Sequence, residues 1–133
     1  MDLGLRGTNL QSVLIDYTVR MQLSDVYFIT IESAFRLDND GDSVTLSPEE
    51  ASDDALQLLR QLVGYTIEEA TADGAGTLRV VFEGGGARLT VEPDPAYEAW
   101  NVSGPDGALV VSTPGGELAI WKPESNTDES AEN

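Results

Sequence analysis

Apolar and polar residues alternate along most of this chain, and the alternation predicts short β-strands. Apolar residues occupy every second position of residues 19–23 and again of residues 27–31, which is the period of a half-buried strand. Glycine-containing turns punctuate the later chain at residues 74–76, 84–86 and 104–107, and short turns of this kind favour antiparallel pairing. The pattern predicts an α+β fold, predominantly antiparallel β, with about nine short strands.

One segment departs from the alternation and predicts a single amphipathic helix at about residues 48–63. Ser47 is a typical N-cap residue, Pro48 is a typical first helical residue, and Gly64 lies where a glycine often ends a helix. The apolar residues that recur at helical spacing are Ala51, Ala55, Leu58, Leu59 and Leu62.

Residues 5–32 resemble residues 62–92, and we interpret both segments as copies of one three-stranded unit. At a constant offset, Leu5, Gly7 and Asp16 recur as Leu62, Gly64 and Asp73. The likeness continues from Thr18–Leu23 to Thr77–Phe82. The alternative is chance similarity between two β-rich segments. A duplication predicts packing about a pseudo-twofold axis, with the same backbone conformation at Gly7 and Gly64.

The length and composition indicate one domain with few routes to catalysis. The chain has 133 residues, enough for one core, and we expect a domain at residues 1–122 and a disordered acidic tail at residues 123–133. It contains no cysteine and no histidine, which removes disulfides, thiolate metal sites and the usual general base. We therefore assign no catalytic residue and no resident cofactor.

Charge is the strongest bias in the composition. There are 24 acidic and 7 basic residues, giving a formal charge of −17. A field of this sign repels nucleic acid and anionic membranes and is compatible with a basic protein partner. The N-terminus has no signal-peptide pattern and no segment is apolar enough to span a bilayer, so we expect a cytoplasmic protein. The sequence does not select an oligomeric state.

The last third of the chain carries three turn-rich motifs, PDPAYEAW, GPDG and STPGGELAIW, at residues 93–100, 104–107 and 112–121. With these motifs the chain resembles an uncharacterised family of small bacterial domains found mainly in actinobacteria, over most of residues 3–122. The resemblance implies a standalone β-rich domain and carries no activity or catalytic residue with it.

An acidic segment, DNDGDSVTLSPE at residues 38–49, has the carboxylate spacing of an EF-hand calcium loop. Asp38, Asp40, Asp42 and Glu49 stand at the first, third, fifth and twelfth positions. Two features oppose a calcium site: Ser43 replaces the glycine of the sixth position, and the preceding segment alternates like a strand. The alternative interpretation is a solvated connection between a strand and the helix.

Three hypotheses for function follow. The first is a non-enzymatic protein-interaction module, comparable in composition to the immunity proteins that neutralise basic toxins, with a basic partner of unknown identity. The second is a calcium-binding module through residues 38–49. The third is a hydrolase built on carboxylates, for which Asp94 and Glu98 are the pair to inspect. The candidate interaction residues are Tyr97, Trp100, Trp121, Asp53 and Asp54, and the alternative role of the three aromatic residues is core packing.

Overall fold

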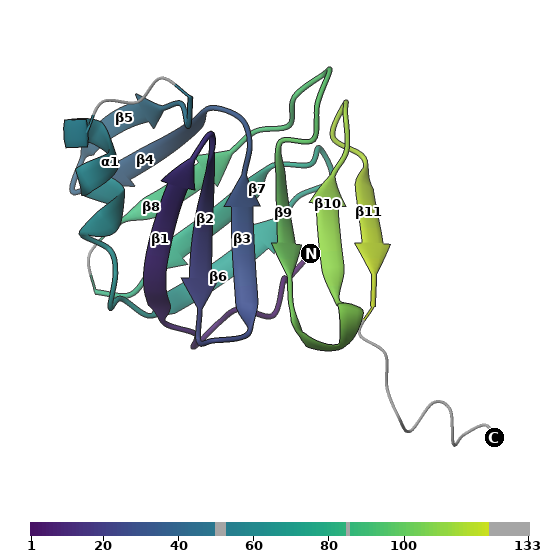
Figure 1. Cartoon of the computed structure of the whole chain (residues 1–133), viewed down its shortest axis with the longest axis horizontal. Coiled ribbons are helices and arrows are strands. Elements are labelled where there is room, and N and C mark those ends of the chain that lie inside the picture. Colours follow the sequence, from purple (N-terminus) through teal and green to yellow (C-terminus); the bar gives the residue numbers. More distant parts are fainter. Residues whose placement is uncertain (50–52, 85, 123–133) are drawn as a thin grey trace.

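The computed structural model describes residues 1–49, 53–84 and 86–122 and consists of two antiparallel sheets that face each other (Figure 1). The elements, in chain order, are β1 (Leu10–Asp16), β2 (Thr18–Leu23), β3 (Tyr27–Ile31), β4 (Phe35–Asn39), β5 (Asp42–Leu46), α1 (Asp53–Arg60), β6 (Ile67–Ala72), β7 (Leu78–Phe82), β8 (Arg88–Val91), β9 (Trp100–Ser103), a 3₁₀ turn (Pro105–Gly107), β10 (Leu109–Ser112) and β11 (Leu118–Trp121).

One sheet has six strands in the order β1-β2-β3-β9-β10-β11, and the other has five in the order β5-β4-β8-β7-β6. Every strand pair is antiparallel. The helix α1 contacts β1 and β5, which places it at one end of the molecule, while β11 lies at the other end (Figure 1). The prediction of a predominantly antiparallel β fold with one helix is confirmed.

The core fills the space between the sheets, because alternate residues of each strand point to the inner face. Residues 19–23 of β2 and residues 78–82 of β7 have the same alternation of buried and accessible positions. One connected apolar cluster includes Leu23, Ile29, Phe82 and Leu89, all almost fully buried. No helix in the described part of the chain is long and apolar enough to cross a membrane.

The strand count was predicted too low, because the described residues form eleven strands. The two additional strands are β4 and β5, which pair as a hairpin across the segment predicted to be an acidic loop. Asp40 and Gly41 both have positive φ, at 53° and 90°, as the central residues of a type I′ hairpin turn require. Phe35, Leu37 and Leu46 are buried by the hairpin.

The helix is shorter than predicted. Its assigned range is Asp53–Arg60, and Pro48 and Glu49 lie in a turn, so Pro48 is not the first helical residue. Residues 50–52 lie outside the described residues. At the other end, residues 61–64 form turns in which the Leu62 N–H donates to the carbonyl of Leu59. These tighter bonds end the helix before Gly64.

The segments that precede β1 and β6 lie side by side and exchange backbone hydrogen bonds. The four bonds run from Gly7 N to Ile67 O (2.9 Å), Gly64 N to Leu10 O (2.7 Å), Ile67 N to Thr8 O (2.7 Å) and Leu10 N to Tyr65 O (2.9 Å). In the proposed repeat Gly7 corresponds to Gly64, Thr8 to Tyr65 and Leu10 to Ile67. Exchanging each residue for its counterpart turns the first bond into the second and the third bond into the fourth. Gly7 and Gly64 have φ of 89° and 99°, and β1 and β6 carry their register shifts at corresponding residues.

Candidate functional site

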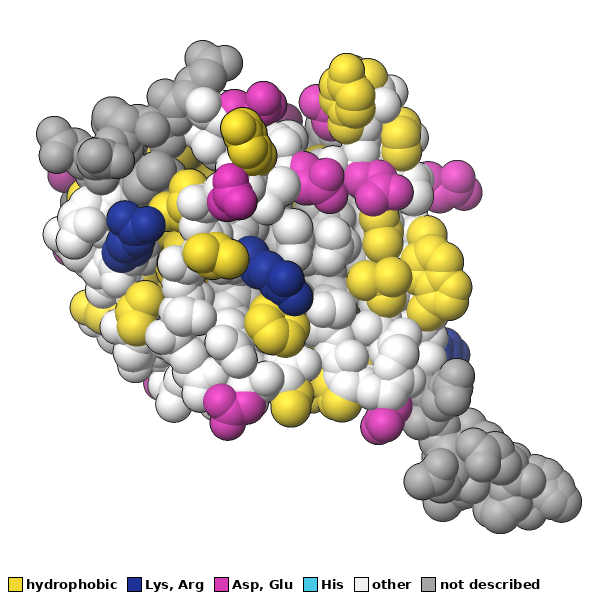
Figure 2. Space-filling model, viewed as in Figure 1, with side chains coloured by type: hydrophobic (Ala, Val, Ile, Leu, Met, Phe, Trp, Pro, Cys, Tyr) yellow, Lys and Arg dark blue, Asp and Glu magenta, His cyan; other side chains and the backbone are white. Residues whose placement is uncertain are grey.

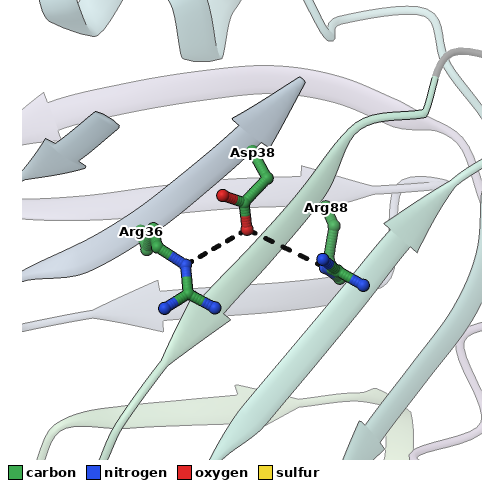
Figure 3. A network of polar contacts seen from close by, with 3 residues as sticks. All are labelled: Arg36, Asp38 and Arg88. Atoms are coloured by element: carbon green, nitrogen blue, oxygen red, sulfur yellow. Dashed lines mark hydrogen bonds and ion pairs between the residues drawn. The ribbon is translucent and has the colours of Figure 1, made fainter. Parts of the chain in front are cut away.

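Asp38, the first residue of the acidic segment, is held by two arginines, whereas Asp40, Asp42 and Glu49 are exposed. Asp38 of β4 lies 3.1 Å from the Nε of Arg36 and 3.8 Å from that of Arg88 on the neighbouring strand β8 (Figure 3). A hydrogen bond from Ser43, followed by the two arginines, holds the pKa of Asp38 below its usual value. Asp38 is therefore a charged structural residue of the five-stranded sheet.

The four residues predicted to bind calcium do not converge. Asp40 and Asp42 lie at the tip of the β4–β5 hairpin and line a cavity together with Val44 and Leu58, whereas Glu49 lines a different cavity. Among the described residues no group of three or more histidine, cysteine, aspartate or glutamate side chains is placed to hold a metal ion. The hairpin pairing of β4 and β5 accounts for the separation, because an EF-hand loop must wrap around its ion.

Acidic residues instead gather at one end of the six-stranded sheet. The register places Asp16 at the end of β1, Glu32 directly after β3, Glu98 before β9 and Glu117 before β11. We call these four residues the acidic rim. Figure 2 shows acidic side chains in a row across this end of the molecule. The antiparallel order of the strands explains the gathering, since alternate strand termini meet at the same edge.

A cavity of about 400 Å³ opens behind the rim, and we call it the acidic cavity. Its lining residues are Glu32, Ser33, Ala34, Ser47, Glu49, Asp94, Tyr97 and Glu98. Four of these carry carboxylates and none carries a positive charge. Partial burial, together with the nearby charge of Glu98, raises the pKa of Glu32 above its usual value. The cavity is thus a strongly negative site in which carboxylates repel one another.

Asp94 shapes the loop that closes one side of this cavity. Its Oδ1 accepts hydrogen bonds from the backbone N–H groups of Ala96 (2.7 Å) and Tyr97 (3.0 Å), an Asx-type turn. The turn leaves the Tyr97 side chain 72% exposed. The proposed acid–base pair, Asp94 and Glu98, does lie in a cavity, but the raised pKa belongs to Glu32, and the hydrolase hypothesis stays a prediction.

The other candidate interaction residues separate. Trp100 is fully buried, and its indole N–H donates to the carbonyl of Gly76 at 2.9 Å, so it is a core residue and not a surface contact. Trp121 is 53% exposed and lies at the end of β11 opposite the acidic rim. Asp53 and Asp54 begin α1, and their side chains lie outside the described residues.

Sequence reasoning missed Glu32 and Tyr17. Tyr17 is 78% exposed and follows Asp16 with a φ of 60° in the β1–β2 turn, next to the acidic rim. Glu32 ends the first predicted unit, and its counterpart Glu92 ends the second. That repetition was the one sequence signal that could have drawn attention to Glu32. Its position near Glu49 and Glu98 could not be predicted, because it depends on contacts between strands far apart in sequence.

The fold and the site together define a small acidic β domain of two facing antiparallel sheets with a negative cavity at one end. The chain belongs to a family described as "Family of unknown function (DUF6188)", whose sequence profile matches residues 1–122. The resemblance to an uncharacterised family is confirmed at this level. No curated protein and no solved structure matches the chain.

Proposed function

We propose that the protein is a non-enzymatic interaction module that binds a basic protein through the acidic cavity and the acidic rim. The observation that carries the proposal is the composition of the cavity: Glu32, Glu49, Asp94 and Glu98 line it, with no basic residue among them. A partner that inserts lysine or arginine there relieves the repulsion between these carboxylates. Complementary charge of this kind also accelerates association.

The exposed tyrosines support a protein partner in particular. Tyr97 borders the cavity and Tyr17 lies next to the rim, and these are the two most exposed of the large apolar and aromatic side chains in the described residues. Tyrosine is enriched among the residues that dominate binding energy at protein interfaces. Its ring also attracts arginine and lysine through cation–π contacts. The site therefore combines charge with aromatic anchors.

We also propose that the two three-stranded units arose by duplication. The interchanging hydrogen bonds between residues 7–10 and 64–67 support this proposal, because two copies related by a pseudo-twofold axis make such bonds in pairs. The similar φ angles of Gly7 and Gly64 and the corresponding register shifts support it further. The second unit contributes no residue to the acidic rim, whereas the first unit contributes Asp16 and Glu32.

The test compares partner capture by the natural chain and by the double variant Glu32→Gln/Glu98→Gln. The chain is immobilised and exposed to lysate of its native host at low salt, and the dissociation constant of any stoichiometric partner is then measured against both forms. We expect the double variant to bind at least about tenfold more weakly. Glutamine at position 32 is compatible with folding, because the folded chain disfavours the ionised form of Glu32.

The matched control is Glu68→Gln/Glu69→Gln on β6, which removes the same charge from two exposed residues remote from the cavity. It should bind like the natural chain. Equal weakening by both double variants would show that net charge alone attracts the partner and would overturn the assignment to the cavity. Binding that is insensitive to salt would contradict the proposal as a whole.

A further inference from the structure

The four edge strands of the two sheets differ in whether another segment covers them. The edge strands β1 and β5 lie against α1. The edge strand β6 is covered by the N-terminal residues, since the Leu3 N–H donates to Ala70 and the Ala72 N–H donates to Met1. Within the described residues no segment covers β11, which is the outermost strand of the six-stranded sheet (Figure 1). An uncovered edge is a template for a further strand.

The backbone groups that β11 offers can be assigned from the neighbouring bonds. The Thr113 N–H donates to the Glu117 carbonyl at 2.9 Å, so these two residues form a hydrogen-bonded pair of the β10–β11 ladder. Such pairs alternate along an antiparallel ladder with pairs whose N–H and C=O groups point away. Leu118 and Ile120 belong to the second kind. Their N–H and C=O groups, and those of Lys122 by continuation, point outward from the edge.

The side chains of β11 lack the usual protection of an edge. Natural edge strands carry charges, prolines or bulges that prevent pairing, whereas residues 118–121 read Leu-Ala-Ile-Trp. Ile120 and Trp121 are 47% and 53% exposed, and Figure 2 shows apolar side chains gathered over this end of the sheet. Ile120 also lines a mostly apolar cavity of about 210 Å³ with Leu3 and Val110.

We propose that β11 pairs antiparallel with β11 of a second copy, joining two six-stranded sheets into one. The register that uses all three outward-facing residues is centred on Ile120. It places Ile120 opposite Ile120 of the second copy, and Leu118 opposite the other copy's Lys122. On the opposite face of the sheet it places Ala119 against Trp121. The small alanine leaves room for the indole, so the strand is complementary to itself.

Charge also favours this end of the molecule for self-association. Each copy carries a formal charge of −17, and two such copies repel each other at long range. The residues of β11 are uncharged, and the only lysine of the chain, Lys122, follows them. The contact is therefore apolar at its centre, and the electrostatic repulsion between the two negatively charged chains opposes it. It should strengthen as salt screens that repulsion.

The test is sedimentation velocity of the full chain over a concentration series at about 0.05 and 0.5 M NaCl, on either side of physiological screening. We expect a two-chain species whose dissociation constant falls at the higher salt. Ile120→Lys and Ile120→Glu, each alone, should weaken association at least about tenfold, because like charges then lie directly opposite each other. An equimolar mixture of these two variants should restore the two-chain species, because unlike charges then face each other across the axis.

The control is Leu14→Lys on β1, a residue that is 63% exposed at the far edge of the same sheet. It should leave the association unchanged. A single-chain species at every concentration up to about 1 mM, which corresponds to a binding free energy near −4 kcal/mol, would overturn the proposal. So would a two-chain species that Ile120→Lys does not weaken, or a mixture of variants that fails to restore it. Self-association should strengthen with salt, whereas binding of a basic partner should weaken with salt. The two experiments can therefore contradict this proposal and the proposed function independently of each other.

Discussion

Gly76 and Gly116 set how closely the two sheets approach at the end of the molecule that carries the acidic rim. Gly76 lies in the turn between β6 and β7, and Gly116 lies in the turn between β10 and β11. A Cβ atom on Gly76 would overlap the carbonyl oxygen of Gly116, and one on Gly116 would overlap that of Ala75. The Gly76 carbonyl also accepts the indole N–H of Trp100. Two turns from opposite sheets are thus locked by backbone contact.

Gly76→Ala should destabilise the fold strongly. Gly76 has a φ of 92°, where an alanine costs about 1–3 kcal/mol, and the overlap with Gly116 adds to that cost. Gly74→Ala in the same turn is the control, because nothing lies within 4 Å of its added Cβ and its φ is not positive. Thermal unfolding of both variants checks the prediction. Equal melting temperatures would show that the two turns separate at little cost.

Asp38→Asn should lower the melting temperature at neutral pH, because the arginines then face a neutral side chain. The pKa of Asp38 in the folded chain is below its usual 3.8. Its contribution to stability is therefore complete above that value and is lost as the pH falls through the folded pKa. The difference in melting temperature between the variant and the natural chain should be visible at pH 7 and shrink below about pH 3.8.

Asp42→Asn, in the same hairpin, is the control without an arginine contact in the described residues. An effect of Asp38→Asn that does not change with pH would contradict the ion-pair explanation.

At the scale of elements, the fold is organised around the junction where residues 7–10 meet residues 64–67. The junction joins the start of β1 in one sheet to the start of β6 in the other. Thr66 adds a side-chain hydrogen bond to Asn9 at 2.7 Å, across the centre of the junction. Its bonds connect residues far apart in sequence and tie one sheet to the other.

The proposed duplication predicts equal effects of Gly7→Ala and Gly64→Ala. Both glycines have positive φ and open space where a Cβ would lie, so the cost in each case is the left-handed conformation, about 1–2 kcal/mol. Denaturant unfolding of each single variant measures it. Effects that differ by more than about 1 kcal/mol would mean that the two positions are not equivalent in the energetics of the fold.

The β-rich architecture was predictable because alternation is a local signal. The period of two in β2 and β3 and the glycine-rich turns were sufficient to predict antiparallel strands. The hairpin β4–β5 was not predicted, although Asp40-Gly41 is a typical hairpin turn, because residues 38–49 were interpreted either as a calcium loop or as a solvated connection between a strand and the helix. The local spacing of acidic residues could not reveal their partners, and Arg88 reaches Asp38 only through the pairing of β4 with β8.

The candidate site was less predictable than the fold. Tyr97 and Trp100 lie three residues apart, yet one is exposed and the other is fully buried, and their spacing in sequence does not distinguish them. The acidic cavity draws its carboxylates from three separate segments of the chain, residues 32–34, 47–49 and 94–98. Such a site follows from the strand order of both sheets, which the alternation pattern does not specify.

At the scale of the whole molecule, two surfaces with opposite physical character lie at opposite ends of β11. The acidic rim includes Glu117 at the start of this strand, and the apolar edge includes Trp121 at its end. Under the two proposals, salt should weaken the binding of a basic partner at the first surface and strengthen self-association at the second. Two chains paired through β11 would keep both acidic cavities open, one in each chain, so the proposed two-chain species would present two sites for a basic partner. Such an arrangement raises avidity without any new contact.

The two tryptophans give this molecule a built-in pair of optical reporters. The indole of Trp100 is enclosed and hydrogen-bonded to Gly76, whereas the indole of Trp121 is half exposed. Indole fluorescence shifts to shorter wavelength as water is excluded from the ring. Emission from Trp100 therefore responds to the opening of the contact between the sheets, and emission from Trp121 responds to what covers the edge of β11. The summed emission of one unlabelled chain is thus sensitive to both unfolding and assembly.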